Sequence, residues 1–321
     1  MKFHFVYPNG EHYQGTRVAE GEEWPLYYGA PAAWILQGYF RLRDHLPGES
    51  TIGSLPRQDA MNITTACTLR RLVRTTRLEP CFIVNCLTDK PDYTGEAVRI
   101  VQNRNQVGSP RDIWMPLWPQ PGLVPRERPA GRRLVLGFFG RPRYGLGNLR
   151  GAGLGRRIEA LGYDYREIPA ERWHDYSDVD VAVGIRAFRN HRYDHKPPSK
   201  LVNAWHAGVP FIGGEDSAYS QIGEPGHDFL RVTGPEGLLA SLELLRDPDT
   251  YRRLVDAGRV RAEAFSLERQ TARWVEALGT RANHWYTQWQ AAGSPAWRRR
   301  RHWQIRLQVI GTRLGRRFGW F

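Results

Sequence analysis

Two lysines, a serine and two prolines stand together in residues 196–210, which read Lys-Pro-Pro-Ser-Lys-Leu-Val-Asn-Ala-Trp-His-Ala-Gly-Val-Pro. The prolines exclude helix before Ser199, which is a favourable N-cap residue. Apolar residues at helical spacing follow, and Gly208 before a proline ends the helix. The first turn of such a helix presents backbone N–H groups, and Lys196 and Lys200 flank it here. The segment therefore predicts a phosphate site.

The residues upstream predict a strand that brings this helix to the edge of a parallel sheet. Residues 178–185, Asp-Val-Asp-Val-Ala-Val-Gly-Ile, are an apolar run of the kind buried in parallel sheets. The order strand, loop, helix, strand places the helix N-terminus at the carboxyl end of the sheet, where diphosphates bind. Arg186 follows the strand at the same edge, and it is there either as a ligand contact or as a structural residue.

This segment resembles the donor-binding half of GT-B glycosyltransferases, which use nucleotide-sugar donors. The resemblance rests on the Lys-Pro start, the second lysine and the Ala-x-x-x-Gly-x-Pro exit of the helix. It continues through the loop 213–226 and the helical segments 234–245 and 251–259, and it covers roughly residues 130 to 278. It implies a nucleoside-diphosphate sugar as donor substrate and no separate cofactor. The donor-binding residues expected are Gly140, Arg141, Arg186, Lys196, Ser199, Lys200, Asn203, Glu215 and Ser217.

One departure from the family pattern concerns two glutamates eight positions apart, which many retaining members carry. Here these positions hold His195 and Asn203. An amide still hydrogen-bonds a ribose hydroxyl, so donor binding is compatible with the change. The usual marker of the retaining mechanism is missing, and the stereochemistry stays open.

The fold expected is α/β, with two Rossmann-like domains in a GT-B arrangement. Strand-then-helix alternation begins with residues 2–8 and 32–45 and restarts at residues 134–139, which indicates two parallel sheets. Residues 114–125 contain four prolines and predict an extended connector. We therefore expect an acceptor-side domain at 1–127, a nucleotide-sugar-binding domain at 128–280 and a basic aromatic-rich tail at 281–321.

The loop after the strand 134–139 begins with Gly140 and Arg141 and is rich in glycine. Its spacing does not match the dinucleotide fingerprint, because Arg150 stands where the third glycine belongs. Either the loop admits the donor diphosphate beside its arginines, or it is a flexible surface turn.

The net charge of +13 lies mainly in the tail. Nine of the 46 basic residues and none of the 33 acidic residues follow Glu276, which leaves 37 basic against 33 acidic residues before it. In residues 297–321, apolar side chains recur at steps of three and four, which predicts an amphipathic helix with arginines on its other side. It either lies on an anionic membrane surface or packs onto the first domain.

Metal ions are not expected in the donor site. Asp178 and Asp180 have the spacing of an Asp-x-Asp motif, but they begin a buried strand and are interpreted as strand-entry residues. The basic cluster supplies the positive charge that a leaving diphosphate needs, so a metal-independent transferase is predicted. The candidate catalytic bases are Glu11 and His12, in the loop after the first strand, and Asp89, at the end of another strand; spacing distinguishes none of them.

Two functions are compatible with the sequence. The first is a hexosyltransferase-type enzyme of polysaccharide biosynthesis that moves sugar to a lipid-linked or polysaccharide acceptor at a membrane surface. The second is a non-catalytic basic protein that binds anionic lipid or nucleic acid on the same scaffold. Nucleic acid is the less expected partner, because the body of the chain carries little net charge. With no signal segment and no apolar run near 18 residues, the expected location is cytoplasmic, peripheral on the inner face of a membrane.

Overall fold

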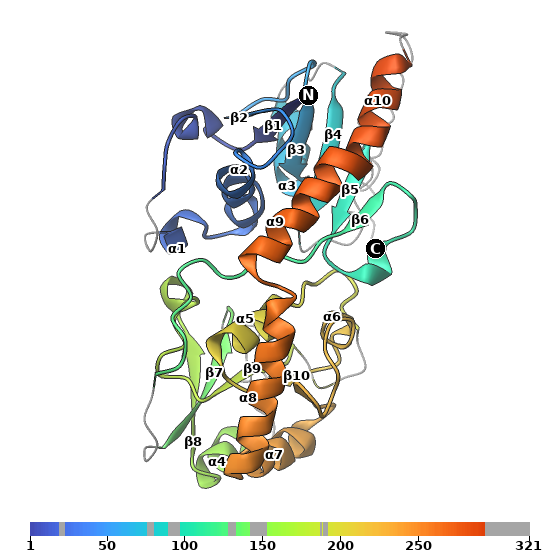
Figure 1. Cartoon of the computed structure of the whole chain (residues 1–321). Coiled ribbons are helices and arrows are strands. Elements are labelled where there is room, and N and C mark those ends of the chain that lie inside the picture. Colours follow the sequence, from blue (N-terminus) through green and yellow to red (C-terminus); the bar gives the residue numbers. More distant parts are fainter. Residues whose placement is uncertain are drawn as a thin grey trace. The chain divides into compact units, whose positions relative to one another are not determined.

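The computed structural model describes residues 1–18, 23–75, 80–88, 97–127, 133–141, 153–186, 188 and 192–292. Three expectations from the sequence lie outside these residues: the role of Asp89, the structure of the loop 142–152 and the amphipathic helix at 297–321. The described chain forms two compact units, coloured along the sequence in Figure 1. Each unit is an α/β structure built on a parallel sheet.

The first unit contains a six-stranded sheet in the order β2-β1-β3-β4-β5-β6. All its strand pairs are parallel, as the alternation of strands and helices predicted. The strands are β1 (Lys2–Val6), β2 (Glu49–Gly53), β3 (Met61–Thr65), β4 (Phe82–Leu87), β5 (Val98–Val101) and β6 (Asp112–Trp114). The helical segments up to this point are η1 (Gly10–Tyr13), α1 (Glu23–Leu26), η2 (Ala32–Leu36), α2 (Gln37–Leu42), α3 (Ala66–Thr75) and η3 (Arg104–Gln106).

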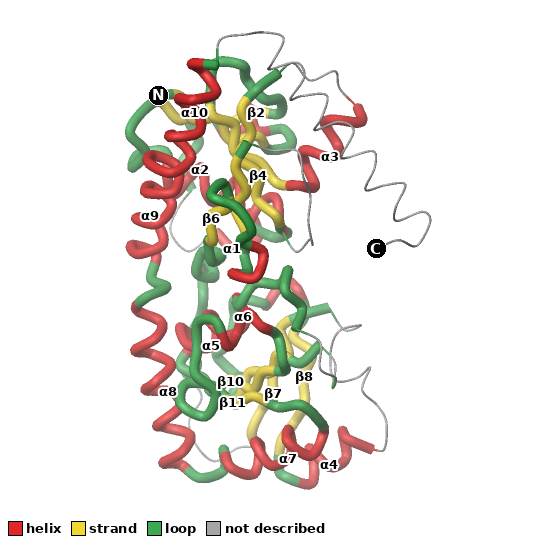
Figure 2. The backbone as a smooth tube through the Cα atoms, turned by 90° about the vertical axis from the view of Figure 1, so that its right-hand side faces the viewer, coloured by secondary structure: helices red, strands yellow, loops and turns green. Residues whose placement is uncertain are grey.

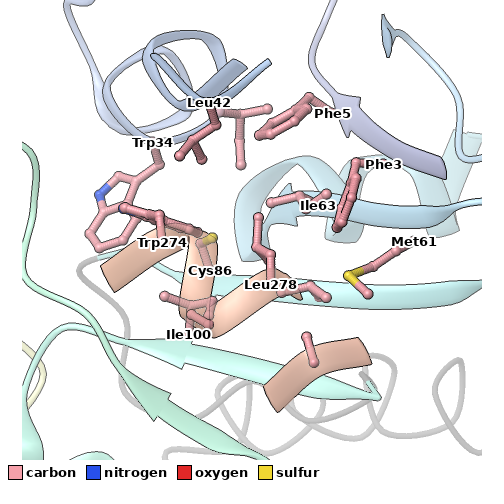
Figure 3. Close-up of a cluster of buried hydrophobic side chains, with 14 of the residues drawn as sticks. Phe3, Phe5, Trp34, Leu42, Met61, Ile63, Cys86, Ile100, Trp274 and Leu278 are labelled. Atoms are coloured by element: carbon pink, nitrogen blue, oxygen red, sulfur yellow. The ribbon is translucent and has the colours of Figure 1, made fainter. Parts of the chain in front are cut away.

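The core of the first unit is completed by helices from much later in the chain. These are α9 (Leu267–Glu276), η8 (Ala277–Ala282) and α10 (Asn283–Ala291). Trp274 and Leu278 are buried and face strand residues such as Ile63, Cys86 and Ile100 (Figure 3). Further along, Tyr286 packs edge-on against Phe82 of β4. Buried apolar residues recur at steps of four, four, four and three through Trp274, Leu278, Ala282, Tyr286 and Trp289, so one face of the helical segment covers the sheet.

The second unit contains a five-stranded parallel sheet in the order β11-β10-β9-β7-β8. Its strands are β7 (Leu134–Phe139), β8 (Tyr163–Ile168), β9 (Val181–Gly184), β10 (Phe211–Gly213) and β11 (Leu230–Arg231). Its helical segments are α4 (Leu154–Ala160), η7 (Ala170–Arg172), α5 (Ser199–Ala207), α6 (Ser217–Ser220), α7 (Pro235–Leu244) and α8 (Pro248–Glu263). In Figure 2, α6 lies toward one end of these strands, and α4 and α7 lie toward the other.

The division of the chain differs from the expected 1–127, 128–280 and 281–321. The first unit includes residues up to Trp118, and it resumes at Gln270. The second unit takes Pro119–Arg269 together with the short piece Glu20–Pro25. The physical reason is the apolar face of α9, η8 and α10, which buries its tryptophans in the first core. Residues 270–292 are therefore part of a domain rather than an end of the donor domain followed by a tail.

No helix among the described residues is long and apolar enough to cross a membrane.

Candidate functional site

Helix α5 forms where the sequence predicted it, with its first residue one position earlier than expected. Pro198 occupies the N-cap position, and Ser199 is the first helical residue without a side-chain capping hydrogen bond. The N–H groups of Leu201 and Val202 both donate to the Pro198 carbonyl oxygen, at 3.0 and 3.2 Å. Pro198 suits this position because it has no N–H of its own to satisfy. The expectation that Ser199 caps the helix was wrong, and its hydroxyl is left for other partners.

The end of α5 is as predicted. Gly208 adopts a left-handed conformation with φ of 70°, and its N–H donates to the carbonyl oxygen of Trp205. Trp205 is buried, and its indole N–H donates to the carbonyl oxygen of Asp228 at 3.0 Å. The helix is thus anchored on its apolar face and sharply ended, which fixes the direction of its first turn.

An ion pair joins the loops that follow two neighbouring strands of the second sheet. The Arg186 Nε donates to Asp216 Oδ2 at 2.8 Å. Arg186 follows β9 and Asp216 follows β10, and the parallel register pairs the strand ends Gly184 and Gly213. Since carboxyl ends of parallel strands meet at one edge, this register is what brings the arginine to the acid. The Asp216 side chain is almost fully buried, and 18% of the Arg186 side chain is exposed.

The electrostatic surroundings of Asp216 contain three cationic side chains. Burial raises the pKa of the Asp216 carboxyl, and attraction by Arg186, Lys200 and Lys196 opposes this effect without cancelling it. The two lysines that the sequence assigned to a phosphate site therefore act on the same carboxylate as Arg186. Asp216 was not among the residues expected from the sequence, although both of its neighbours, Glu215 and Ser217, were. Its only signal was a carboxylate just past the Gly213-Gly214 pair at a strand end.

Lys200 reaches across to the carboxyl end of β7. Its Nζ lies 5.8 Å from the centre of the Phe138 ring. A Cβ added to Gly140 would lie 3.6 Å from the Lys200 Cε and 2.7 Å from the Phe138 ring. Gly140 and Lys200, two of the residues expected in the donor site, thus lie close together. Arg141 is exposed next to Gly140 in the sequence, and the loop 142–152 that follows it lies outside the described residues.

The loop before α5 is tied to the loop before α6. The N–H of Ser217 donates to the Arg192 carbonyl oxygen at 2.7 Å, and Ser217 itself is buried. Tyr193 has a left-handed backbone with φ of 50°, and its carbonyl oxygen accepts from the Lys196 N–H at 2.8 Å. The Arg186 guanidinium lies 5.7 Å from the centre of the Tyr193 ring. Glu215 is partly exposed at this edge, and Asp216, not Glu215, occupies the N-cap position of α6.

Asn203 lies one turn after the start of α5, where its side chain is held by two neighbours. Its Nδ2 donates to Gln120 Oε1 at 3.3 Å. Its side chain is also hydrogen-bonded to the hydroxyl of Tyr176, a fully buried residue. Gln120 belongs to the proline-rich connector and was not singled out from the sequence. His195, the other position that differs from the family pattern, is partly buried in the loop before the helix.

The candidate bases Glu11 and His12 lie in η1 of the first unit. Glu11 accepts hydrogen bonds from the Ser54 N–H at 2.7 Å and from the Ser54 hydroxyl at 2.5 Å. These bonds lower the pKa of the Glu11 carboxyl, which makes it a weaker base. His12 is exposed, and its carbonyl oxygen accepts from the Thr16 hydroxyl.

Asp178 and Asp180 are each engaged by arginines. Asp180 is buried and accepts from Arg126 at 2.8 Å and from the Val135 N–H at 2.7 Å. Asp178 pairs with Arg166 at 3.0 Å. Their carboxylates therefore tie strand entries together, in line with the structural interpretation. Among the residues that the structure describes, no three His, Cys, Asp or Glu side chains gather as a metal site would require.

Comparison with known proteins places this arrangement among glycosyltransferase structures. AviGT4, a glycosyltransferase involved in avilamycin A biosynthesis, superposes with a TM-score of 0.54 over 88% of this chain and 98% of its own, at 12% sequence identity. HepE of Anabaena, solved with UDP and glucose, gives a TM-score of 0.50 over 68% of this chain and 78% of its own, at 11% identity. TarM gives 0.49 at 10% identity over 69% of this chain, which spans about half (55%) of the TarM chain.

These likenesses confirm the fold expected from the sequence. The chain has two parallel α/β units of the GT-B kind, as AviGT4 does over nearly its whole length. No family model matches the sequence, and no curated protein matches it.

Proposed function

We propose that this protein is a glycosyltransferase that takes a nucleoside-diphosphate sugar as donor and binds the diphosphate at the start of α5. The observation that carries the proposal is the gathering of Arg186, Lys196 and Lys200 around Asp216, at the carboxyl edge of the sheet. The strand order of the sheet reverses between β7 and β9, which are followed by Gly140 and by Arg186, and ligands of open α/β sheets bind at such a reversal. The shared fold adds support, since AviGT4 is a glycosyltransferase and HepE was solved with UDP.

The residues of the site have distinct roles in this proposal. The Lys200 side chain and the N–H groups of Ser199 and Lys200, at the start of α5, bind the diphosphate, which leaves as an anion when the sugar is transferred. Lys196 adds positive charge, and Arg186 is held in place by its ion pair with Asp216. Gly140 lies beside Lys200, and a larger residue is disfavoured there because even a methyl group would crowd the Phe138 ring. Glu215 and Ser217 are the candidates for contacts to sugar hydroxyls.

Catalysis without a divalent metal is part of the proposal, because the cations of this site stabilise the leaving group on their own. His12, Glu11 and Asp89 remain the candidate bases for deprotonating the acceptor. Glu11 is the weaker candidate, because the hydrogen bonds from Ser54 lower its pKa. A comparison of His12→Gln, Glu11→Gln and Asp89→Asn tests the three: the base is the residue whose variant loses transfer and still binds the donor.

The decisive experiment offers the purified protein a panel of nucleotide sugars and measures sugar release, while free nucleoside diphosphates are titrated in a thermal-shift assay. Sugar release from one donor and stabilisation by its nucleoside diphosphate are expected. Stabilisation by a nucleotide with no release or transfer from any donor would favour a non-catalytic binding protein. Failure of every nucleotide to bind would overturn the donor site.

The proposed acceptor is a lipid-linked or polysaccharide sugar chain at an anionic membrane surface, as in polysaccharide biosynthesis on the cytoplasmic side. Support comes from the nine arginines after Glu276, which no acidic residue offsets. Each arginine near acidic lipid contributes about 1 kcal/mol of attraction. The full chain should sediment with anionic vesicles at low salt, and a chain truncated after Gly293 should stay in solution. Indifference of the full chain to vesicles, or unfolding of the truncated chain, would favour packing of residues 297–321 on the protein.

A further inference from the structure

A buried tyrosine holds the carboxylate that pairs with Arg186. Tyr219 lies in α6 and is buried, and its hydroxyl is hydrogen-bonded to the Asp216 side chain. On the same carboxylate, Oδ2 accepts from the Arg186 Nε at 2.8 Å. A carboxylate that accepts from two side chains is held in direction as well as in place. The arginine is therefore paired with an acid whose own orientation is fixed from inside the protein.

Two glycines at neighbouring strand ends leave room for this tyrosine. Gly184 and Gly213 end β9 and β10 and are partners in the parallel register. A Cβ added to Gly184 would lie 2.8 Å from the Tyr219 hydroxyl oxygen, and one added to Gly213 would lie 2.9 Å from Cδ2 of the Tyr219 ring. Neither glycine has a positive φ, so the space that Tyr219 takes accounts for both of them. Packing thus fixes the hydroxyl beside Asp216.

A ligand can reach the arginine of this group, although it cannot reach the acid. The Asp216 side chain is 2% exposed, whereas 18% of the Arg186 side chain is exposed. Lys196 and Lys200 act electrostatically on the same carboxylate, so a phosphate bound by these lysines lies near Arg186 as well. The direction from which Arg186 meets that phosphate is set on the protein side, by Asp216.

We propose that Tyr219 is a positioning residue of the donor site: its hydroxyl orients the Asp216 carboxylate, and the carboxylate orients Arg186 toward the diphosphate. This inference rests on the proposed donor site at α5. Tyr219 touches neither the donor nor the reacting atoms. Its hydroxyl therefore contributes to donor binding only through Arg186, and the contribution disappears when Arg186 is absent.

Substitution of Tyr219 by phenylalanine tests the inference, because it removes the hydroxyl and keeps the ring. Calorimetry of the full chain first identifies the tightest ligand among UDP, GDP, ADP and CDP. Tyr219→Phe should bind this ligand about three- to tenfold more weakly, which is part of the strength of one charge-assisted phosphate contact.

Tyr163→Phe is the matched control. Tyr163 is a fully buried tyrosine of the same unit, and its hydroxyl donates to the Leu242 carbonyl oxygen at 2.9 Å. Loss of this bond should lower the melting temperature and leave the affinity for the nucleoside diphosphate unchanged. The control thus shows what removal of a buried tyrosine hydroxyl does when it has no route to Arg186.

Double-mutant cycles separate positioning from general damage to the fold. In an Arg186→Met chain, Tyr219→Phe should cause no further loss of affinity, because the group through which the hydroxyl acts is missing. In a Lys200→Ala chain, it should cause the same fold-change as in the wild type, because Lys200 is a separate contact. If Arg186→Met does not fold, Arg186→Met/Asp216→Leu, which removes the unpaired charge, replaces it as the background with the same expectation.

Three outcomes would overturn the inference alone, provided that binding still depends on Lys200. These are equal affinity of Tyr219→Phe and the wild type, the same fold-change from Tyr219→Phe with and without Arg186, and an equal loss in Tyr163→Phe. Absence of binding by any of the four nucleoside diphosphates would overturn the proposed function and this inference together.

Discussion

The two sheets of this molecule share one strand order but differ in the charge at the same point of the order. In each, the first strand lies between the second and the third, as β1 lies between β2 and β3 and β7 between β8 and β9. At this reversal the second unit gathers Arg186, Lys196, Lys200 and Asp216. The equivalent edge of the first unit carries no such group of cations among its described residues.

Polar residues at the carboxyl edge of the first sheet are buried and neutral. Thr65 accepts a hydrogen bond from the Thr68 N–H and so starts α3, Gln102 donates to the Leu87 carbonyl oxygen, and Asn103 starts η3. They complete the ends of strands and the starts of helices. The topology thus provides a place for a ligand in both units, whereas the side chains decide which ligand class fits. Among the residues that the structure describes, it is the second unit that gathers cations at this edge.

Among the substitutions that test this difference between the units, removal of Arg186 should have the largest effect, a loss of unfolding free energy. Arg186→Met leaves the buried Asp216 without its ion-pair partner, which costs about 3 to 5 kcal/mol of unfolding free energy. Denaturant unfolding measures it. Arg157→Met, which breaks an exposed pair with Glu236, is the control and should change the free energy of unfolding far less, because solvent screens that pair. Recovery of stability in Arg186→Met/Asp216→Leu would identify the unpaired charge as the cause, and a loss as small as that of the control would contradict it.

The same variant should depend on pH in a defined direction. Burial already raises the pKa of Asp216 above its ordinary 3.8, and loss of Arg186 raises it further. The folded state then binds the proton more tightly than the unfolded state, so stability falls as pH rises from 3.8 through the raised pKa. Unfolding free energies should therefore differ most from the wild type near pH 7 and least near pH 4. A constant difference across this range would show that the carboxylate charge is not involved.

The difference between the two units can also be tested by ligand affinity, through removal of Lys200. Lys200→Ala removes one charge-assisted phosphate contact, worth about 1.5 to 3 kcal/mol, so nucleoside diphosphate affinity should fall tenfold or more. The melting temperature of the free protein should change little, because Lys200 is partly exposed. Lys2→Ala in the first unit, whose lysine pairs with Asp59 at the surface, is the matched control and should bind as the wild type does. Equal affinity of the Lys200 variant would remove the site.

A smaller effect is expected from the first unit. Thr65→Ala deletes the cap of α3 and should lower the unfolding free energy by about 1 kcal/mol, whereas Thr65→Ser should retain most of the stability. Nucleoside diphosphate affinity should stay unchanged in both variants, as calorimetry would verify. A weakened affinity would contradict the assignment of anion binding to the second unit.

No effect at all is expected from chelation. Activity should be complete after treatment with EDTA, because protein cations carry the leaving diphosphate. Loss of turnover that manganese or magnesium restores would contradict this and would reopen the role of Asp178 and Asp180.

The sequence was most informative where local pattern alone decides the structure. The ends of α5 were predicted to within one residue from Gly208 and from the prolines before Ser199, because helix ends depend on single residues. Asp216 could not be assigned in advance, because its pairing with Arg186 depends on the register between Gly184 and Gly213. Gln120 lay in a connector that reads only as extended, and its partner Asn203 comes 83 residues later.

The division into two units differs from the expected domain boundaries for a related reason. Trp274 and Leu278 lie at helical spacing, and that spacing gives a buried face without saying which core receives it. Only the packing against Ile63 and Ile100 identifies the first sheet as that core.

Helices α9, η8 and α10 pack on the first sheet although they come late in the chain, and this determines the order in which the two units can fold during synthesis. The first 118 residues leave the ribosome with one apolar face of the sheet uncovered, and its cover is synthesised only after the whole of Pro119–Arg269. The second unit, which is nearly continuous in sequence, is able to complete its fold first, and the unit that begins the chain finishes last. Until Trp274 and Leu278 emerge, the sheet that contains Phe3 and Ile63 is a surface on which a chaperone would bind.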